Sequence, residues 1–579
     1  MRLPVVTKAF MARFWMRVMS TRPGSIPAAR NRGLAKPRTM RSVSASRITT
    51  TPRPPSLPPW AAAAPGTSTG VKNASMSSSA RNGASSFPMP AILARADRER
   101  PAPQPRRGAP ATLAALGLLA LAGCGTVSNA VSGLTGGGPA PGQPGYVSGF
   151  LGGAVADEPR AALVAREVLS VGGTAADAAV AAGFAMAVTL PSRTGLGAGG
   201  ACLVYTHSRN TTEALLFLPP AGTAAGGDRP AAVPMLARGL FALHTRNPRR
   251  PFEELMAPAE QLARFGATVS RAFAQDLAAV SGPLFADPRA RALYADAAGR
   301  PLAEGERMTQ ADLGATLGAL RVSGVGDLHQ GALARRLEAA SPGIGGPLTV
   351  EQLRPALPSV TAPLQVSVGS DILSFLPAPA DGGLAAAAAF QALQAGEGVD
   401  AASQRGLAVS HAWRQGGADP AALLARPPAF PGAAPVLPAS AGLMTLDRDG
   451  NAVSCVFTLN NLFGTGRVVP QMGFLLAAAP GVGRVEPPLL AAALAHNANL
   501  RAFRYAGTGT GQAAAPIALA LPAARHLLNR TGIDAAVAGV PEPGRANAIG
   551  CPAYLPGNSA QCAAATDPRG AGLAIGGGL

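Results

Sequence analysis

The pattern of apolar and polar residues predicts a β-hairpin over residues 440–460. Two apolar runs rich in strand-forming residues, 440–446 and 452–459, flank the polar sequence Asp447-Arg448-Asp449-Gly450-Asn451. An Asp-Gly pair between two such runs favours a tight turn that joins antiparallel strands. Taken by itself, this hairpin is typical of any sheet protein, so its meaning depends on the segments around it.

Two helices are predicted at the start of the folded part of the chain. The first begins at residues 157–159 (Asp-Glu-Pro), because acidic side chains and a proline both suit a helix N-terminus, and it stops at Gly172-Gly173. Thr174, with Asp177 three residues later, predicts the N-terminal cap of the second helix. This second helix is expected to end at Pro191.

A glycine-rich segment, residues 192–200, follows the second helix. It precedes two predicted strands, 201–206 and 213–217. Loops that cradle phosphates lie between a strand and a helix, which is the opposite order. We therefore exclude nucleotide binding here, and the sequence predicts no cofactor.

Charge is concentrated at the N-terminus rather than spread over the chain. The net charge is +19, but residues 1–123 hold 19 of the 50 Lys and Arg residues and only two of the 31 acidic residues. The remainder is nearly neutral, which argues against a nucleic-acid-binding face. The few cysteines and histidines lack the spacing of metal-binding motifs, so no metal site is predicted.

The first part of the chain resembles a leader and an anchor. Residues 1–105 are basic and rich in Pro, Ser and Thr, which predicts disorder. Residues 106–124 combine two arginines, a short apolar run and the sequence Leu-Ala-Gly-Cys ending at Cys124. This pattern is typical of a secretory signal and resembles a bacterial lipoprotein box, which implies lipidation at Cys124. The alternative is an ordinary apolar helix. A Gly/Pro/Ser-rich tether, 125–145, follows.

The leader has two consequences for the rest of the chain. A signal so far from the first residue suggests that translation starts further in, near Met89, and that the upstream part is a misassigned start. Attachment to a membrane through Cys124 predicts a location on the periplasmic side of the cell envelope. Because that environment is oxidising, Cys551 and Cys562 are a candidate disulfide, with two free thiols as the alternative.

The ordered set of motifs resembles the γ-glutamyltranspeptidase family. The matching parts are the capped helix after Gly172, the glycine-rich segment at 192–200, the helix of residues 251–266 and the hairpin at 440–460. The resemblance implies an α/β fold, the four-layer αββα sandwich of the N-terminal-nucleophile hydrolases. It also implies a large segment, 146–439, that pairs with a small segment, 440–579, after the chain cleaves itself.

The family places its nucleophile ten residues before the glycine of the hairpin turn, which implies Ser440 here. The bond between Ala439 and Ser440 would then be the cleavage site, and the new α-amine would serve as general base. Thr458 matches a family position beside the nucleophile. Asn460 matches a position that binds the amine of a small amide or peptide substrate.

A glycine-rich run at residues 507–511 resembles the loop whose amide groups stabilise the oxyanion in this family. This resemblance implies catalytic roles for Gly509 and Gly511.

The family's substrate clamp is replaced by apolar residues. Leu218 stands where an arginine holds the γ-glutamyl carboxylate, and Val482 stands near the position of an acid. The matching serine pair falls within residues 490–492, which are Leu-Ala-Ala, and the residue after the nucleophile is Ala441. The sequence therefore predicts an amidohydrolase with an altered substrate. The alternative is an inactive envelope lipoprotein that uses the same fold as a binding scaffold, in which Ser440 is an ordinary serine.

Overall fold

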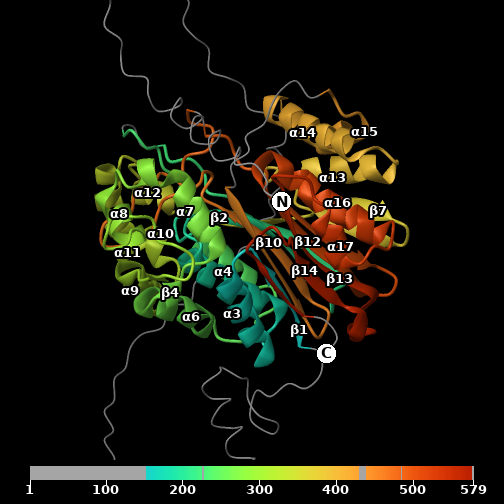
Figure 1. Cartoon of the computed structure of the whole chain (residues 1–579), viewed down its shortest axis with the longest axis horizontal. Helices are drawn as coiled ribbons and strands as arrows, with labels where there is room; N and C mark the ends of the chain where they lie inside the picture. Colours follow the sequence, from blue (N-terminus) through green and yellow to red (C-terminus); the bar gives the residue numbers. More distant parts are fainter. Residues whose placement is uncertain (1–150, 224–226, 417, 430–438, 484, 577–579) are drawn as a thin grey trace, which may run out of the picture. The chain divides into compact units, whose positions relative to one another are not determined.

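Two β-sheets lie face to face at the centre of the fold, with helices on both outer sides (Figure 1). The computed structural model describes residues 151–223, 227–416, 418–429, 439–483 and 485–576. The predicted leader, the lipidation site at Cys124 and the tether lie outside these ranges.

The first sheet has seven strands in the order β15-β1-β9-β10-β2-β3-β6, and every neighbouring pair is antiparallel. Its strands are β1 (Gly152–Ala156), β2 (Gly199–Thr206), β3 (Thr211–Phe217), β6 (Ser359–Thr361), β9 (Ser440–Asp447), β10 (Ala452–Thr458) and β15 (Leu573–Ile575). The hairpin predicted from the Asp-Gly turn is confirmed as β9 and β10.

The second sheet has six strands in the order β14-β13-β12-β11-β8-β7, also antiparallel throughout. Its strands are β7 (Leu364–Val368), β8 (Asp371–Phe375), β11 (Ala491–Asn497), β12 (Ala502–Thr510), β13 (Arg545–Leu555) and β14 (Ala563–Thr566). The inner faces of the two sheets share a core of small and aliphatic side chains, which includes Met444, Leu494 and Ile549.

Helices cover the outer face of each sheet, which confirms the predicted αββα arrangement (Figure 1). The first sheet is covered by α3 (Pro159–Ser170), α4 (Ala175–Thr189) and α5 (Leu236–His244), and the second by α13 (Gly382–Gln394), α16 (Ala515–Leu527) and α17 (Ile533–Ala538). Close packing depends on glycine: a Cβ on Gly183 of α4 would lie 2.9 Å from Leu240 and 3.4 Å from Phe457 of β10.

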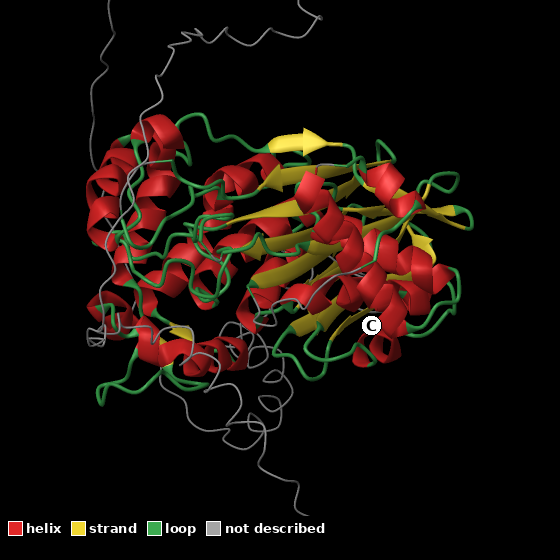
Figure 2. Cartoon of the chain, turned by 90° about the horizontal axis from the view of Figure 1, so that it is seen from above, coloured by secondary structure: helices red, strands yellow, loops and turns green. Residues whose placement is uncertain are grey.

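Further helices lie outside these layers. Next to α13 are α14 (Val399–Gly416) and α15 (Pro420–Ala425). The segment between β3 and β6 forms a helical group beside the sheets (Figure 2). It contains α6 (Phe252–Phe265), α7 (Arg271–Leu284), α8 (Pro288–Tyr294), α9 (Ala311–Ser323), α10 (Asp327–Gln330), α11 (Ala332–Ala340), η1 (Ser341–Ile344), α12 (Val350–Leu353) and the short strands β4 (Ala267–Thr268) and β5 (Arg307–Met308).

The local sequence signals are confirmed where they were strongest. Thr174 and Asp177 form a reciprocal capping box at the start of α4, in which each side chain accepts a hydrogen bond from the other's backbone N–H at 3.1 Å. Glu158 caps α3 by accepting from the Ala161 amide at 2.8 Å. These caps satisfy N–H groups that a helix leaves unpaired, which explains why the chain enters both helices where it does.

Two disulfides join cysteines of the described ranges. Cys551 and Cys562 are bonded, as the sequence allowed. Cys202 and Cys455 form a second disulfide, which sequence reasoning missed because 253 residues separate them. No helix in the described ranges combines the length and the apolar composition that crossing a bilayer requires. Within the same ranges, no group of three or more His, Cys, Asp or Glu side chains is placed to hold a metal ion.

Candidate active site

Ser440 is the first residue of β9, and its side chain faces the opposite sheet. Side chains alternate between the two faces of a strand. Met444 and Leu446 belong to the core between the sheets, so Ser440, which is an even number of residues away, shares that face. The residue is 2% exposed. A hydroxyl is therefore held at the end of a buried strand, in the layer between the two sheets.

The pairing of strands brings Thr458 directly opposite Ser440. The register pairs Ser440 of β9 with Thr458 of β10, and Thr458 with Gly199 of β2. Leu218 continues the same row, because Phe217 before it pairs with Gly200. At the usual spacing of about 4.8 Å between strands, the Leu218 backbone lies roughly 14 Å from that of Ser440.

The Thr458 side chain connects Ala439, the residue before the predicted cleavage site, with Asn460. Its hydroxyl donates a hydrogen bond of 2.6 Å to the carbonyl oxygen of Ala439. The same Oγ1 accepts a bond of 2.8 Å from the backbone N–H of Asn460. Because the hydroxyl oxygen accepts from this amide, its proton is directed towards the Ala439 carbonyl. The donor is thus aimed at the peptide bond that precedes Ser440.

Asn460 turns the chain beyond β10. Its φ is +63°, in the left-handed region that asparagine tolerates better than most residues. The side-chain Nδ2 donates to the carbonyl oxygen of Ala478 at 2.8 Å. This bond ties the segment after β10 to residues 477–479. These residues lie at the same end of the first sheet as Asn460. Its predicted role in substrate binding stays a prediction.

A buried polar cluster, comprising Asp157, Gly442, Thr508 and Asn547, lies two residues along β9 from Ser440. The Gly442 amide donates to Asp157 Oδ2 at 2.7 Å. Asn547 Nδ2 donates to Asp157 Oδ1 at 2.7 Å and to Thr508 Oγ1 at 3.3 Å. Burial raises the pKa of the Asp157 carboxyl above its ordinary value, while the positive charge of Arg193 opposes that rise. The cluster fixes the start of β9 against the second sheet.

The prediction of a glycine-rich loop at 507–511 is wrong in its secondary structure. Gly507 and Gly509 lie inside β12, which pairs with β11 on one side and β13 on the other. A Cβ on Gly509 would lie 2.2 Å from the Ala515 carbonyl oxygen and 2.7 Å from the Leu519 amide. Gly509 thus faces the helical layer, where the lack of a side chain allows α16 to approach. This packing role accounts for the glycine without a catalytic function.

Gly511 differs from Gly509 in position. It follows the last residue of β12, has a φ of +114° and precedes the short helix η2 (Gln512–Ala514). Gly442 of β9 lies against Thr508, where an added Cβ would come within 2.4 Å of Thr508 Oγ1. Gly450, in the turn that follows β9, lies near Leu555, which pairs with Phe503 at the start of β12. The two strands therefore run in opposite directions, and Gly511 lies towards the Ser440 end of the sandwich.

Apolar side chains occupy the positions at which the sequence analysis expected a substrate clamp. Leu218 packs against the core between the sheets, and Leu490 and Ala492 belong to that core. Ala441 is fully buried on the opposite, helical face of β9. Val482 is 40% exposed. The structure thus brings Leu218 and Leu490 into one apolar cluster and leaves Val482 at the surface.

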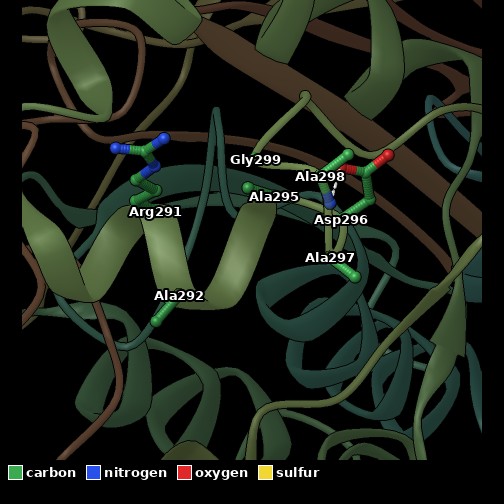
Figure 3. A pocket seen from close by; sticks show the side chains of 7 residues that line it. All are labelled: Arg291, Ala292, Ala295, Asp296, Ala297, Ala298 and Gly299. Carbon is green, nitrogen blue, oxygen red and sulfur yellow. Dashed lines mark hydrogen bonds between the residues drawn. The ribbon is translucent and has the colours of Figure 1, made fainter.

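Two hollows formed by described residues lie apart from this row. One, of about 530 Å³, is formed by the end of α8 and the turn after it, from Arg291 to Gly299 (Figure 3). Another, of about 520 Å³, lies where the ends of α16, β13 and β14 meet, and it is lined by residues that include Arg504, His526 and Tyr554. Neither contains a residue of β9 or β10.

The fold places the protein in a known structural class. It is similar to the crystal structure of cephalosporin acylase from Bacillus halodurans, with a TM-score of 0.62 and 19% sequence identity over 76% of this chain and 98% of that chain. The two structures share one α/β fold, which agrees with the αββα sandwich predicted from the sequence.

Sequence comparison finds similarity to one family over part of the chain. Residues 161–414 match the Gamma-glutamyltranspeptidase family model. The chain is 26% identical over 381 residues to a glutathione hydrolase proenzyme of Escherichia coli, covering 55% of this chain and 66% of that protein. The corresponding protein of Pseudomonas aeruginosa is 29% identical over 396 residues, covering 57% and 69%. Human glutathione hydrolase 6 is 31% identical over 312 residues, covering 54% and 55%.

The chain is thus similar to the γ-glutamyltranspeptidase family over residues 161–414 and to several glutathione hydrolases. It spans about two thirds of the two bacterial relatives and about half of the human one.

Proposed function

We propose that the protein is an N-terminal-nucleophile amidohydrolase that cleaves its own chain between Ala439 and Ser440. The observation that carries this proposal is the hydrogen bond of 2.6 Å from the Thr458 hydroxyl to the Ala439 carbonyl oxygen. Such a donor stabilises the negative charge that develops on a carbonyl oxygen under attack, and it costs no reorganisation because it is already in place. The residue that follows this carbonyl carries a hydroxyl.

Self-cleavage requires only groups that meet at the start of β9. Ser440 Oγ attacks the Ala439 carbonyl carbon, and its proton passes to the departing Ser440 nitrogen. The bond from carbon to nitrogen breaks, which leaves the carbonyl joined to Ser440 Oγ as an ester with a free α-amine. Water then hydrolyses this ester and releases a carboxylate at Ala439. Thr458 holds the carbonyl oxygen throughout both additions.

The same groups would act on a substrate after cleavage. An α-amine with an ordinary pKa of about 7.7–8.0 is partly unprotonated near neutral pH and can take the proton of Ser440 Oγ. The hydroxyl attacks the substrate amide, the amine leaves with that proton, and water completes the hydrolysis. Gly511 lies towards this end of the sandwich and remains our proposal for a further oxyanion donor.

We expect a substrate whose acyl group is not γ-glutamyl. Leu218 and Leu490 offer no partner to the α-carboxylate of a glutamyl group, and burying an unpaired carboxylate is strongly disfavoured. Turnover of a γ-glutamyl anilide at rates typical of enzymes, about 1–1,000 s⁻¹, would refute this expectation. Hydrolysis of anilides with aliphatic acyl groups would support it.

The decisive experiment follows the covalent state of the purified chain. A reducing denaturing gel and mass analysis should show two fragments, the smaller beginning at Ser440. Ser440→Ala should abolish the cut. Ser454→Ala is the matched control, because Ser454 is a buried serine of the same hairpin that donates to the Gly507 carbonyl oxygen at 2.9 Å. A chain that stays whole after long incubation would favour the inactive scaffold, and a cut in Ser440→Ala would exclude Ser440 as the nucleophile.

We also propose that the protein is anchored in the envelope through a lipid on Cys124. Two disulfides among the described cysteines support an oxidising location. The expected result is incorporation of labelled palmitate that is lost in Cys124→Ala. Absence of label in the wild-type protein, expressed in a bacterium that processes lipoproteins, would contradict the anchor.

A further inference from the structure

We infer that the disulfide between Cys202 and Cys455 joins the two products of cleavage into one covalent molecule. This inference rests on the proposed cleavage at Ser440. Cys202 lies in β2, before the cut, and Cys455 lies in β10, after it. When the peptide bond before Ser440 breaks, the disulfide becomes the covalent link between the large and the small fragment.

The position of this disulfide is set by the pairing of strands rather than by a flexible loop. Cys202 and Cys455 are directly opposed in the β2–β10 ladder, with Cα atoms 4.0 Å apart. Opposed residues in antiparallel strands bring their Cβ atoms close together. The sheet therefore aligns the two sulfur atoms both before and after cleavage.

Both sulfur atoms lie where solvent cannot reach them. Each cysteine is 0% exposed. Cys455 is two residues from Phe457, which contacts α4, so the disulfide lies on the helical face of the first sheet rather than beside Ser440. A reductant reaches the bond only when α4 separates from the sheet. We therefore expect the folded protein to keep its cross-link in concentrations of thiol that reduce exposed disulfides.

The second disulfide supplies an internal control. Cys551 and Cys562 are 11 residues apart, and both lie in the small segment. Breaking this bond leaves the two fragments as connected as before. If only the variant without the Cys202–Cys455 disulfide separates into two bands, that disulfide links the fragments. A general effect of removing a disulfide would appear in both variants.

The chemistry of the cross-link is independent of the cleavage reaction. Two thiols lose two protons and two electrons when they form the bond, and a protein disulfide of the oxidising compartment accepts the electrons through thiol–disulfide exchange. Hydrolysis of the peptide bond adds one water and leaves the S–S bond unchanged. Cleavage at Ser440 should therefore add the mass of one water to that of the oxidised, uncut protein.

The test is a denaturing gel of the purified protein after blocking of free thiols, run with and without reductant. We expect one band without reductant and two bands with it. Two bands in both lanes would overturn the inference and leave the proposed cleavage intact. One band in both lanes would overturn the proposed cleavage, and the inference with it.

Variants separate this connection from effects on folding. Cys202→Ala with Cys455→Ala should release two fragments without reductant, whereas Cys551→Ala with Cys562→Ala should still run as one band. A second measurement uses refolding from denaturant without reductant. Recovery should be independent of protein concentration for the cross-linked form, because its fragments remain tethered. It should fall on dilution for the first variant, and equal recovery at all concentrations would contradict the tether.

Discussion

Replacing Thr458 by valine tests the origin of self-cleavage most directly. The change keeps the size of the side chain and removes the donor that reaches the Ala439 carbonyl oxygen at 2.6 Å. Loss of one donor to a developing oxyanion slows reactions by about 10²–10³-fold, or roughly 3–4 kcal/mol of transition-state stabilisation. We therefore expect the cleavage rate constant of Thr458→Val to fall by about that factor.

The same substitution also affects stability, and this effect must be separated. Thr458 Oγ1 accepts from the buried Asn460 amide at 2.8 Å. Leaving that N–H without a partner costs about 1–3 kcal/mol. The urea midpoint of the uncleaved chain measures this loss independently of the reaction.

Thr445→Val is the matched control on β9. The Thr445 hydroxyl is also buried, and it donates to the Ala175 carbonyl oxygen at 2.7 Å, on the helical face. We expect a similar loss of stability and no loss of cleavage. Thr458→Ser should restore cleavage to within about tenfold of wild type, because the hydroxyl returns but the methyl group that restrains its rotamer does not.

The assay follows the fraction of uncut chain on reducing gels after synthesis is stopped. A folded Thr458→Val protein that cleaves within about fivefold of the wild-type rate would refute the reasoning, since the donor would then supply only about 1 kcal/mol.

Three further outcomes follow from the buried cluster and the terminal disulfide. Gly442→Ala should destabilise the fold by about 1–3 kcal/mol, because the added Cβ would lie 2.4 Å from Thr508 Oγ1. Adding Thr508→Ala to this variant should restore part of the lost stability, as measured by urea melts. The raised pKa of Asp157 means that the folded state binds its proton more tightly than the unfolded state does, so the free energy of unfolding falls as pH rises from about 4 through the raised value. Asp157→Asn should flatten that slope in urea midpoints between pH 4 and 7, and an unchanged slope would contradict the assignment. Removing the bond between Cys551 and Cys562 should cost about 3 kcal/mol, measured by the same melts.

Local sequence signals were sufficient for the framework of the fold. The turn at Asp449-Gly450 and the cap at Thr174 depend on neighbours within a few residues, so the hairpin and the start of α4 could be predicted. The order of these elements then indicated the family and its αββα sandwich. The row that joins Ser440, Thr458 and Leu218 follows from the register of three strands, which no local pattern contains.

The errors and omissions have physical causes. Glycines at 507 and 509 suggested a loop, but glycine inside a strand also marks the close approach of another backbone, which at Gly509 is that of α16. Asp157 was interpreted only as a charge at a helix start, because its partners Gly442 and Asn547 are 285 and 390 residues away. Long-range contacts of this kind required the structure.

The strand order of the first sheet has a consequence for the timing of maturation. β9 and β10 are inserted between β1 and β2, so segments from both sides of residue 440 alternate across a single sheet. In this sheet the strands of each segment fall into two separate blocks, so each segment would expose unpaired edges if it were made separately. The chain must therefore assemble while still whole, and the scissile bond acquires its geometry only after that assembly. When the large and the small segment are expressed together as two separate chains, they should remain insoluble, whereas the intact precursor should be soluble.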